Sequence, residues 1–313
     1  YSGQEASTRY LDFAAQPQID PYGKPESARI QQQWIMLYNA FMPKVKAALA
    51  ERHPYNPADY RTEKMWESAI AARAFDTLRC LLPVGTGTLL SWHTNLRQAR
   101  DHLRRLAHHP LPEVQEVARS IYASLLKKYP NSFNTDDLNP ESLRNSERNA
   151  FCDEDAVADH VLLPESVLRT SDSVRLKAGE VIADTSLLNA PAARVAEGAM
   201  MAARPQGAPP PRRLLKYGVY NLNFLLDFGS FRDLQRHRNG YGPVPLVGPQ
   251  FGFHSWYLEE LKSLLSASDY AALTSTIHAQ FAAIKALNGS PLLDQYLYPM
   301  GMACLCQLTY SIP

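Results

Sequence analysis

Two segments, one in each half of the chain, end a helical stretch in the same way. Residues 79–85 (RCLLPVG) and 295–301 (QYLYPMG) each place a proline in the chain and a glycine two positions later. Proline removes a backbone donor and glycine adopts conformations that other residues avoid, so this pair stops a helix and turns the chain. The helices expected around both segments also come in the same order. The sequence therefore predicts a duplicated domain, and we expect the chain to start inside copy one and end inside copy two.

The spacing of apolar residues predicts where the helices and strands lie. From Ser27 to Arg52, apolar residues recur three and four positions apart, which lays one stripe along one helix face. Further helices are expected at 62–82, 88–109, 112–129, 192–203, 256–265, 267–287 and from 292 onward. Residues 217–228 alternate partly between apolar and polar side chains, which predicts a strand. The expected fold class is α+β, with helix-rich domains, a small antiparallel sheet and two repeats.

A change in composition marks the expected boundary between the repeats. Residues 134–149 (NTDDLNPESLRNSERN) are rich in loop-forming residues. We therefore interpret residues 1–135 as the C-terminal part of a first repeat and 136–175 as a linker. Residues 176–313 are then the N-terminal and central part of a second, divergent repeat.

Charge and composition exclude several classes of protein. The chain has 313 residues, with 32 Lys+Arg against 31 Asp+Glu. Nonspecific nucleic-acid binding needs an excess of positive charge, so no nucleic-acid partner is expected. No apolar run reaches the roughly 20 residues of a membrane span, and we expect no membrane partner. Four cysteines are too few for a disulfide scaffold, which favours a reducing cytoplasm.

Two clusters of polar residues are candidates for chemistry. Residues 236–238 (RHR) follow the expected strand, and guanidinium groups bind phosphate or carboxylate through paired hydrogen bonds. Residues 2–10 (SGQEASTRY) gather hydroxyls, a carboxylate and an arginine, which could hold a uridine-like base and its phosphate. On the residues alone, a solvated basic turn and a polar loop explain these clusters as well as ligand binding does.

Both clusters resemble parts of one motif. Flavin-dependent thymidylate synthases (ThyX) carry the pattern RHRxxSxNxxSxR. The opening of this chain resembles its second part, with Ser2, Ser7 and Arg9 in place and Gln4 where the family has Asn. The RHR at 236–238 resembles its first part, in the second copy.

A third block strengthens the resemblance. The family has an Arg before Leu-Pro, then a Thr, a Trp, and an Asn-x-Arg on the next helix. This chain has the same residues in ungapped spacing: Arg79, Leu82-Pro83, Thr88, Trp92, Asn95 and Arg97. An ordinary amphipathic helix with Trp92 in a core would not explain Arg79, Asn95 and Arg97 together.

The resemblance implies a specific reaction and a set of site residues. Such enzymes make dTMP from dUMP, with methylenetetrahydrofolate as carbon donor and NADPH as reductant, through bound FAD. By position, dUMP would be held by Glu5, Ser7, Arg9 and Arg79. FAD would be held by Asn95, Arg97, Asp101, Arg236, His237 and Arg238. Arg105 and Ser7 are the catalytic candidates, and no metal is implied. The family's sites form between subunits, which implies a homo-oligomer, here a dimer of double-domain chains.

Departures from the family keep a second interpretation open. Leu106 stands where the family has a helix arginine that contacts the uracil. Neighbouring residues of a helix point in directions about 100° apart. Arg105 can therefore take the place of that arginine only if the helix is locally shifted. Asp101 replaces an Asn, Asp233 replaces a nucleotide-contacting Gln, and Gln295 stands where copy one has Arg79. The chain is then either a flavin-dependent thymidylate synthase with one composite site built from both copies, or a non-catalytic flavin- or nucleotide-binding paralogue that acts as a structural partner.

Overall fold

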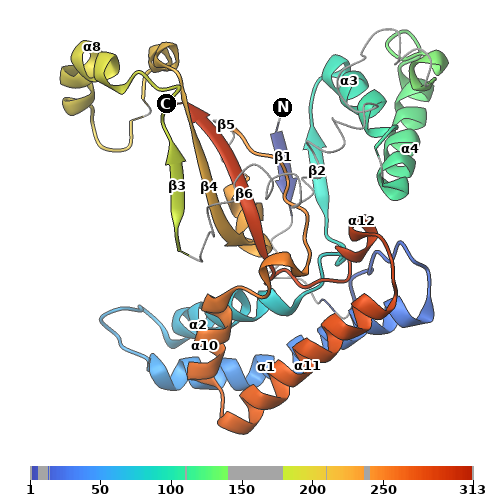
Figure 1. The fold of residues 1–313 in the computed structure, drawn as a ribbon, viewed down its shortest axis with the longest axis vertical. Helices are drawn as coiled ribbons and strands as arrows, with labels where there is room; N and C mark the ends of the chain where they lie inside the picture. The colour runs from blue at the N-terminus through green and yellow to red at the C-terminus, as the bar shows by residue number, and fades with distance from the viewer. Residues whose placement is uncertain are drawn as a thin grey trace.

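The computed structural model describes residues 2–5, 13, 15–109, 111–139, 179–208, 210–235 and 240–311. The described strands form a four-stranded sheet and a two-stranded ribbon. Figure 1 shows that the two rise side by side from a layer of helices. A helical hairpin lies at the far end of the ribbon, and a short helical unit lies at the corresponding end of the sheet. The predicted α+β class with a small antiparallel sheet is confirmed.

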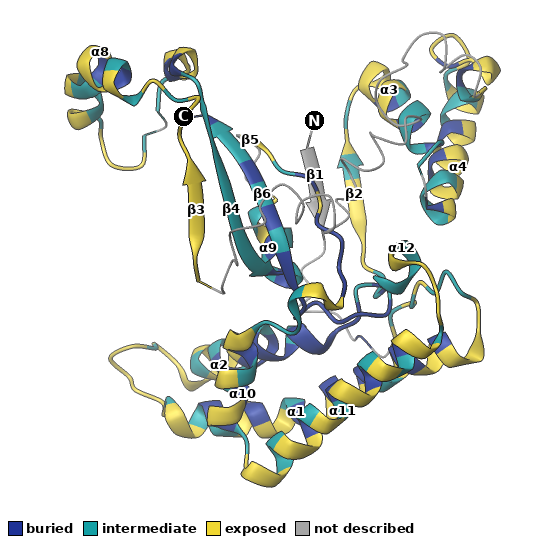
Figure 2. Ribbon diagram, viewed as in Figure 1, coloured by how far each residue is buried: buried dark blue, intermediate teal, exposed yellow. Residues whose placement is uncertain are grey.

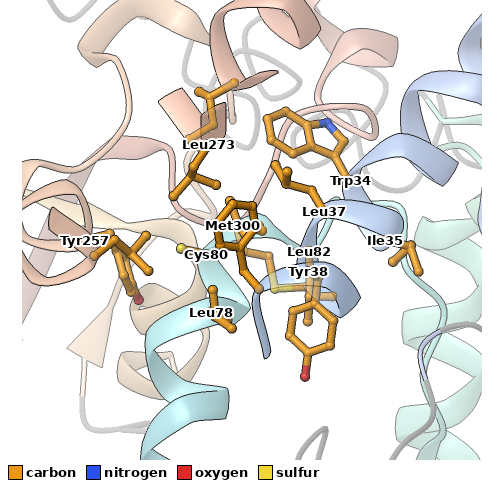
Figure 3. Packing of buried hydrophobic residues seen from close by; sticks show 14 of the residues in the cluster. Trp34, Ile35, Leu37, Tyr38, Leu78, Cys80, Leu82, Tyr257, Leu273 and Met300 are labelled. Carbon is orange, nitrogen blue, oxygen red and sulfur yellow. The ribbon is translucent and has the colours of Figure 1, made fainter. Parts of the chain in front are cut away.

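Four helices make the layer, and both halves of the chain contribute to it. They are α1 (Pro25–Arg52), α2 (Glu63–Leu78), α10 (Ser255–Leu264) and α11 (Ala267–Ala286). Their apolar faces and the segments 80–82 and 297–304 enclose one hydrophobic core, with Trp34, Leu78 and Leu273 fully shielded from solvent. The dark inner faces of the helices in Figure 2 and the packing in Figure 3 show this shared core. The two halves are therefore not separate globules within the described residues.

The C-terminal sheet has a polar and an apolar face. It is antiparallel in the order β3 (Val181–Asp184), β4 (Val219–Asp227), β6 (Ala303–Ser311) and β5 (Gly240–Tyr241). Apolar residues of β4 and β6 pack against α9 (Phe228–Leu234), where Phe231 is almost fully buried. Amide and hydroxyl side chains line the other face and bond across the strands, as from Thr309 Oγ1 to Asn221 Oδ1 at 2.7 Å. This alternation follows from the two-residue period of a strand.

The ribbon joins the start of the described chain to the segment after Gly85. In it β1 (Ser2–Glu5) pairs antiparallel with β2 (Leu90–His93), with Ser2 opposite His93. The helical hairpin beyond β2 consists of α3 (Leu96–Leu106) and α4 (Pro112–Lys128), closed by the 3-10 turn η3 (Thr135–Leu138). The remaining short elements are η2 (Arg79–Leu81), α8 (Ala190–Ala202), η4 (Arg212–Tyr217), η5 (Pro249–Phe251) and α12 (Pro291–Asp294).

The two proline–glycine segments cross at the centre of the molecule. Pro83 and Pro299 lie opposite each other in an antiparallel bridge. The backbone hydrogen bonds beside this bridge come in two corresponding pairs. In the first pair, Val84 N donates to Tyr298 O at 2.9 Å and Met300 N donates to Leu82 O at 2.8 Å. In the second pair, Gly85 N donates to Tyr296 O at 3.0 Å and Gly301 N donates to Cys80 O at 2.8 Å. Each bond maps onto its counterpart when 216 is added to or subtracted from the residue numbers. The crossing thus has local twofold symmetry.

A second set of bonds is similar in form, although only the residues after the crossing, Gly85 with Gly301 and Gly87 with Ala303, are 216 positions apart, whereas their partners Ile19 and His254, and Pro17 and Gly252, are 235 apart. Ile19 N donates to Gly85 O at 2.7 Å, and His254 N donates to Gly301 O at 2.8 Å. Gly87 N donates to Pro17 O at 2.8 Å, and Ala303 N donates to Gly252 O at 2.9 Å. The strands that follow, β2 and β6, each pair antiparallel with a preceding short strand, β1 and β5. The similarity seen in the sequence therefore extends to the local backbone pairing.

The structure corrects three expected elements. The helix expected at 88–109 is instead β2 followed by the shorter α3, because Leu90 to His93 find a pairing partner in β1 and Asn95 caps the new helix start. The helix expected from 292 ends after one turn, and the apolar run beyond it forms β6 at the centre of the sheet. The strand expected at 217–228 ends at Asp227, and Phe228–Leu234, where no helix was expected, form α9. Within the described residues, no helix has the length and apolar character needed to cross a membrane.

Glycine is required at both halves of the crossing. A Cβ on Gly85 would lie 2.6 Å from Ile19 O, and one on Gly301 would lie 2.7 Å from Cys80 Cβ. We expect Gly85→Ala and Gly301→Ala each to lower the free energy of unfolding by about 1–3 kcal/mol, as overpacking of a core does. Urea unfolding followed by circular dichroism measures this. Gly198→Ala on α8 is the control, because its Cβ has only Arg194 at 4.0 Å, and it should not be destabilising.

Candidate functional site

Arg79 stands where α2 ends, and the crossing places it against the second half of the chain. Its backbone begins η2, directly before the crossing segment. The N-terminus of α9 bonds to the other crossing segment, with Gly229 N donating to Met300 O at 3.0 Å. A Cβ on Gly229 would lie 3.5 Å from Arg79 Nε, so the missing side chain lets the arginine approach α9 closely. Residues about 150 positions apart in the chain thus meet here.

The guanidinium of Arg79 binds two side chains of α9. One terminal nitrogen donates to Ser230 Oγ at 3.1 Å, and the other forms an ion pair with Asp233 Oδ2 at 3.2 Å. The Nε atom is shielded from solvent and has no hydrogen-bond partner within the described residues. The side chain of Arg79 is 20% exposed, whereas that of Asp233 is 54% exposed. The pair therefore opens to solvent on the Asp233 side.

A buried carboxylate and a phenol lie beneath this pair. Asp227 caps α9 by accepting from Ser230 N at 2.9 Å, and it also accepts from the Tyr257 hydroxyl at 3.0 Å. Burial and the negative charge of Asp227 raise the pKa of Tyr257, so this phenol stays protonated at neutral pH. Burial alone would lower the pKa of Arg79, but the surrounding Tyr257, Asp233 and Asp227 outweigh it and raise that pKa. The arginine is therefore a permanent, partly buried cation.

Ser230, Asp227 and Tyr257 were not among the residues expected from the sequence. Asp227 and Ser230 form an Asp-x-x-Ser pattern directly after a strand, which is a recognisable helix start. That signal could have located the cap of α9. Nothing local in the sequence indicates that Tyr257, on α10, meets the same carboxylate.

The expected flavin-binding residues of copy one lie on α3, at the other end of β2 from the helical layer (Figure 1). Asn95 caps this helix, its Oδ1 accepting from Gln98 N at 2.9 Å. Arg97 and Asp101 are exposed one turn apart. No hydrogen bond or ion pair of the described residues joins this group to Arg79. The structure therefore brings Arg79 to α9 and leaves Asn95, Arg97 and Asp101 as a separate group.

Leu106, Arg104 and Arg105 differ in what they contact. Leu106 packs against the hairpin core of α3 and α4, which explains an apolar residue at this place. Arg104 donates from Nε to the backbone oxygen of Asp137 at 3.3 Å, so it braces η3. The Nε of Arg105 is shielded and has no partner within the described residues. Of the two arginines, only Arg104 is thus held by a described side-chain hydrogen bond.

Several expected site residues lie outside the described residues. They are Ser7, Arg9, Arg236, His237 and Arg238. Glu5 is described only as the last residue of β1, opposite Leu90. α9 ends at Leu234, so the described chain brings Arg79 to a helix that stops two residues before the RHR segment.

The described cysteines are not reactive thiols. Cys80, Cys304 and Cys306 are buried, and burial raises the pKa of each, that of Cys306 to about 12. A thiol with such a pKa is almost entirely protonated at neutral pH and is a poor nucleophile. No group of His, Cys, Asp and Glu in the described chain is placed to hold a metal ion.

The donor set on α3 fits an anionic cofactor in part. Arg97 offers an exposed guanidinium for phosphate, and the NH2 group of Asn95 has no hydrogen bond within the described residues. Asp101 opposes an anion, because its carboxylate lies one turn from Arg97. The fit to a dinucleotide such as FAD therefore rests on the arginine and the amide.

Fold and site together define an α+β protein in which a partly buried arginine, paired with a carboxylate, lies at the contact between its two halves. Residues 1–131, which comprise the ribbon, α1, α2 and the α3–α4 pair, match the model of the Thy1 family, thymidylate synthase complementing protein. The resemblance stated from the sequence is confirmed for this part of the chain. No curated protein and no solved structure matches the chain.

The hairpin contains an ion pair between a buried carboxylate, Asp137, and a partly exposed arginine, Arg100. Asp137 accepts from Arg100 Nε and Nη2, both at 2.5 Å, and from the Tyr122 hydroxyl. Burial would raise the pKa of Asp137, but these bonds lower it to about 2. The stabilisation is therefore complete above the unfolded pKa of about 4 and is lost as pH falls toward 2.

We expect Asp137→Asn to unfold more easily than the wild type at neutral pH, by about 1–2 kcal/mol. The difference should shrink between pH about 4 and pH about 2, where the wild-type carboxylate also becomes neutral. Urea titrations across this range, followed by hydrogen exchange of α3 and α4, measure it. Asp59→Asn, in an exposed loop, should show no such trend. A difference that is constant with pH would contradict the expectation.

Proposed function

We propose that this chain is a flavin-dependent thymidylate synthase, which converts dUMP to dTMP. Methylenetetrahydrofolate donates its methylene carbon to C5 of the uracil, and NADPH supplies the electrons that reduce it to a methyl group. Bound FAD would supply the hydride chemistry, and the protein would supply position and charge. The match of residues 1–131 supports the class, and Arg79 carries the proposal for the site.

Arg79 supports a composite site at the contact of the two halves. Its partners Ser230 and Asp233 lie on α9, and Asp233 precedes the RHR segment at 236–238 by three residues. In this proposal Arg79 of copy one holds the phosphate of dUMP, and Arg236, His237 and Arg238 of copy two bind the flavin beside it. Ser230 holds one terminal nitrogen of Arg79 at 3.1 Å, and an arginine oriented by a neutral neighbour binds phosphate at a smaller entropic cost than a mobile one.

The duplication is part of the proposal. The paired hydrogen bonds at the crossing and the matching pairs from Ile19 and His254 support a common origin of the two halves. With the same numbering shift of 216, Arg79 corresponds to Gln295. One copy would thus retain the phosphate-binding arginine, and the other copy would carry a neutral amide in its place.

A second chain would complete the site. Arg97 and Asn95 lie away from Arg79 in one chain, so we propose a homo-oligomer in which α3 of one chain approaches the composite site of another. Glu5, Ser7 and Arg9 would then contribute to dUMP binding, and Arg105 and Ser7 would be its catalytic residues. Asn95, Arg97 and Asp101 would contact FAD. We place the protein in the cytoplasm, where reduced folate and NADPH are available.

The alternative function is a non-catalytic flavin- or nucleotide-binding paralogue that acts as a structural partner. One observation favours it: Leu106 packs into the hairpin core where the family has a catalytic arginine. A protein that binds flavin but does not oxidise NADPH or reduced flavin in response to dUMP would establish this alternative. Rescue of a thymidine-requiring strain would reject it.

Loss of the Arg79 charge should weaken dUMP binding. We expect Arg79→Ala to weaken dUMP binding at least about tenfold, because a charged hydrogen bond to phosphate is worth roughly 1.5–3 kcal/mol. Isothermal titration calorimetry measures the affinity, and dUMP-dependent NADPH oxidation measures turnover. Arg52→Ala is the control, because Arg52 also pairs with a carboxylate, Glu260, on the helical layer. Equal dUMP affinity in wild type and Arg79→Ala would reject the site.

The RHR segment is tested separately through the flavin. We expect the double variant Arg236→Ala, Arg238→Ala to lose most of its bound FAD, because both guanidinium groups are proposed to hold the cofactor. Absorbance near the flavin band of the purified protein, before and after FAD is added, gives the bound fraction. Arg212→Ala, Arg213→Ala is the matched control on η4. Unchanged flavin content in the RHR variant would exclude a role for this segment.

A further inference from the structure

Arg79 already holds an anion that belongs to the chain itself. Its ion pair with Asp233 spans 3.2 Å, and the carboxylate lies on the solvent side of the guanidinium. The opposite side is closed by the buried groups of Asp227 and Tyr257. A phosphate that approaches from solvent therefore meets the carboxylate of Asp233 before it can reach Arg79.

The two partners of Arg79 on α9 have different consequences for such a ligand. Ser230 is neutral, and its hydroxyl can donate to a phosphate oxygen as well as accept from Arg79. Asp233 is acidic, and two anions that share one guanidinium repel each other. Because its side chain is 54% exposed, Asp233 can leave the pair without breaking the core.

We propose that Asp233 is an internal counter-ion that occupies the phosphate place on Arg79 and must be displaced when a phosphorylated ligand binds. It is thus a specificity-determining residue: it lowers the affinity for nucleotides and leaves the affinity for an unphosphorylated nucleoside unchanged. The choice of dUMP as the nucleotide rests on the proposed function, whereas the competition between carboxylate and phosphate does not.

The test removes the negative charge of Asp233 and keeps the size of the side chain. We expect Asp233→Asn to bind dUMP and inorganic phosphate about fivefold more tightly than the wild type, a ratio in keeping with a partly exposed ion pair. Affinity for deoxyuridine should not change. Isothermal titration calorimetry with the three ligands gives these ratios, and thermal unfolding confirms that the variants are folded.

Two variants separate the local charge from other effects. Glu260→Gln also removes one negative charge from an Arg–carboxylate pair, 3.0 Å long and bonded to Arg52, and it should leave all three affinities unchanged. Ser230→Ala removes the neutral partner of Arg79 and should not tighten phosphate binding. If Glu260→Gln or Ser230→Ala raised the affinity for phosphate as much as Asp233→Asn does, the inference would be overturned, because the effect would then not be specific to the counter-ion.

The remaining outcomes distinguish this inference from the proposed function. If Asp233→Asn binds inorganic phosphate more tightly but no variant binds dUMP, the counter-ion is supported and the nucleotide proposal fails. If wild type and Asp233→Asn bind dUMP equally well, the nucleotide proposal stands and the counter-ion is rejected. If neither binds phosphate or dUMP, or if Asp233→Asn binds both more weakly, the inference is overturned.

Discussion

The antiparallel crossing at Pro83 and Pro299 is the contact on which the rest of the structure depends. Four backbone hydrogen bonds join the two segments and pair the amides of Val84, Gly85, Met300 and Gly301. Proline at the centre needs no hydrogen-bond acceptor, and glycine two residues later lets the neighbouring backbone approach. The helices of both halves can therefore pack into one core around the crossing, as Figure 3 shows for Cys80, Leu82 and Met300.

The same crossing determines the position of the charged site. Arg79 precedes one crossing segment, and Gly229 of α9 bonds to Met300 of the other. The distance between the arginine and α9 is thus set by backbone bonds and does not depend on flexible side chains. Such preorganisation matters for an anion site, because a guanidinium that is already oriented loses less entropy when it binds.

Much of the helical fold followed from local pattern, and the errors came where distant pairing decided the outcome. The stripe of Ser27 to Arg52 located α1 within two residues, because one helix face records its own burial. Leu90 to His93 were expected in a helix, and only their pairing with Ser2 to Glu5, some 85 residues away, makes them a strand. In the site, Arg79 was found through motif spacing. Tyr257 was not, because no local signal links a phenol on α10 to the cap of α9.

The local symmetry of the crossing also shows how side chains can differ between the two halves while the backbone pairing is the same. The crossing uses backbone atoms on both sides, so the residue before it is free to vary in each half. Arg79 and Gln295 hold equivalent places beside the crossing, yet only the arginine carries a charge, which pairs with Asp233. Since the core is shared, the half with the neutral amide still supports α9 and positions its carboxylate against Arg79. Fold symmetry and site asymmetry are thus compatible, because the backbone maintains the first and single side chains determine the second.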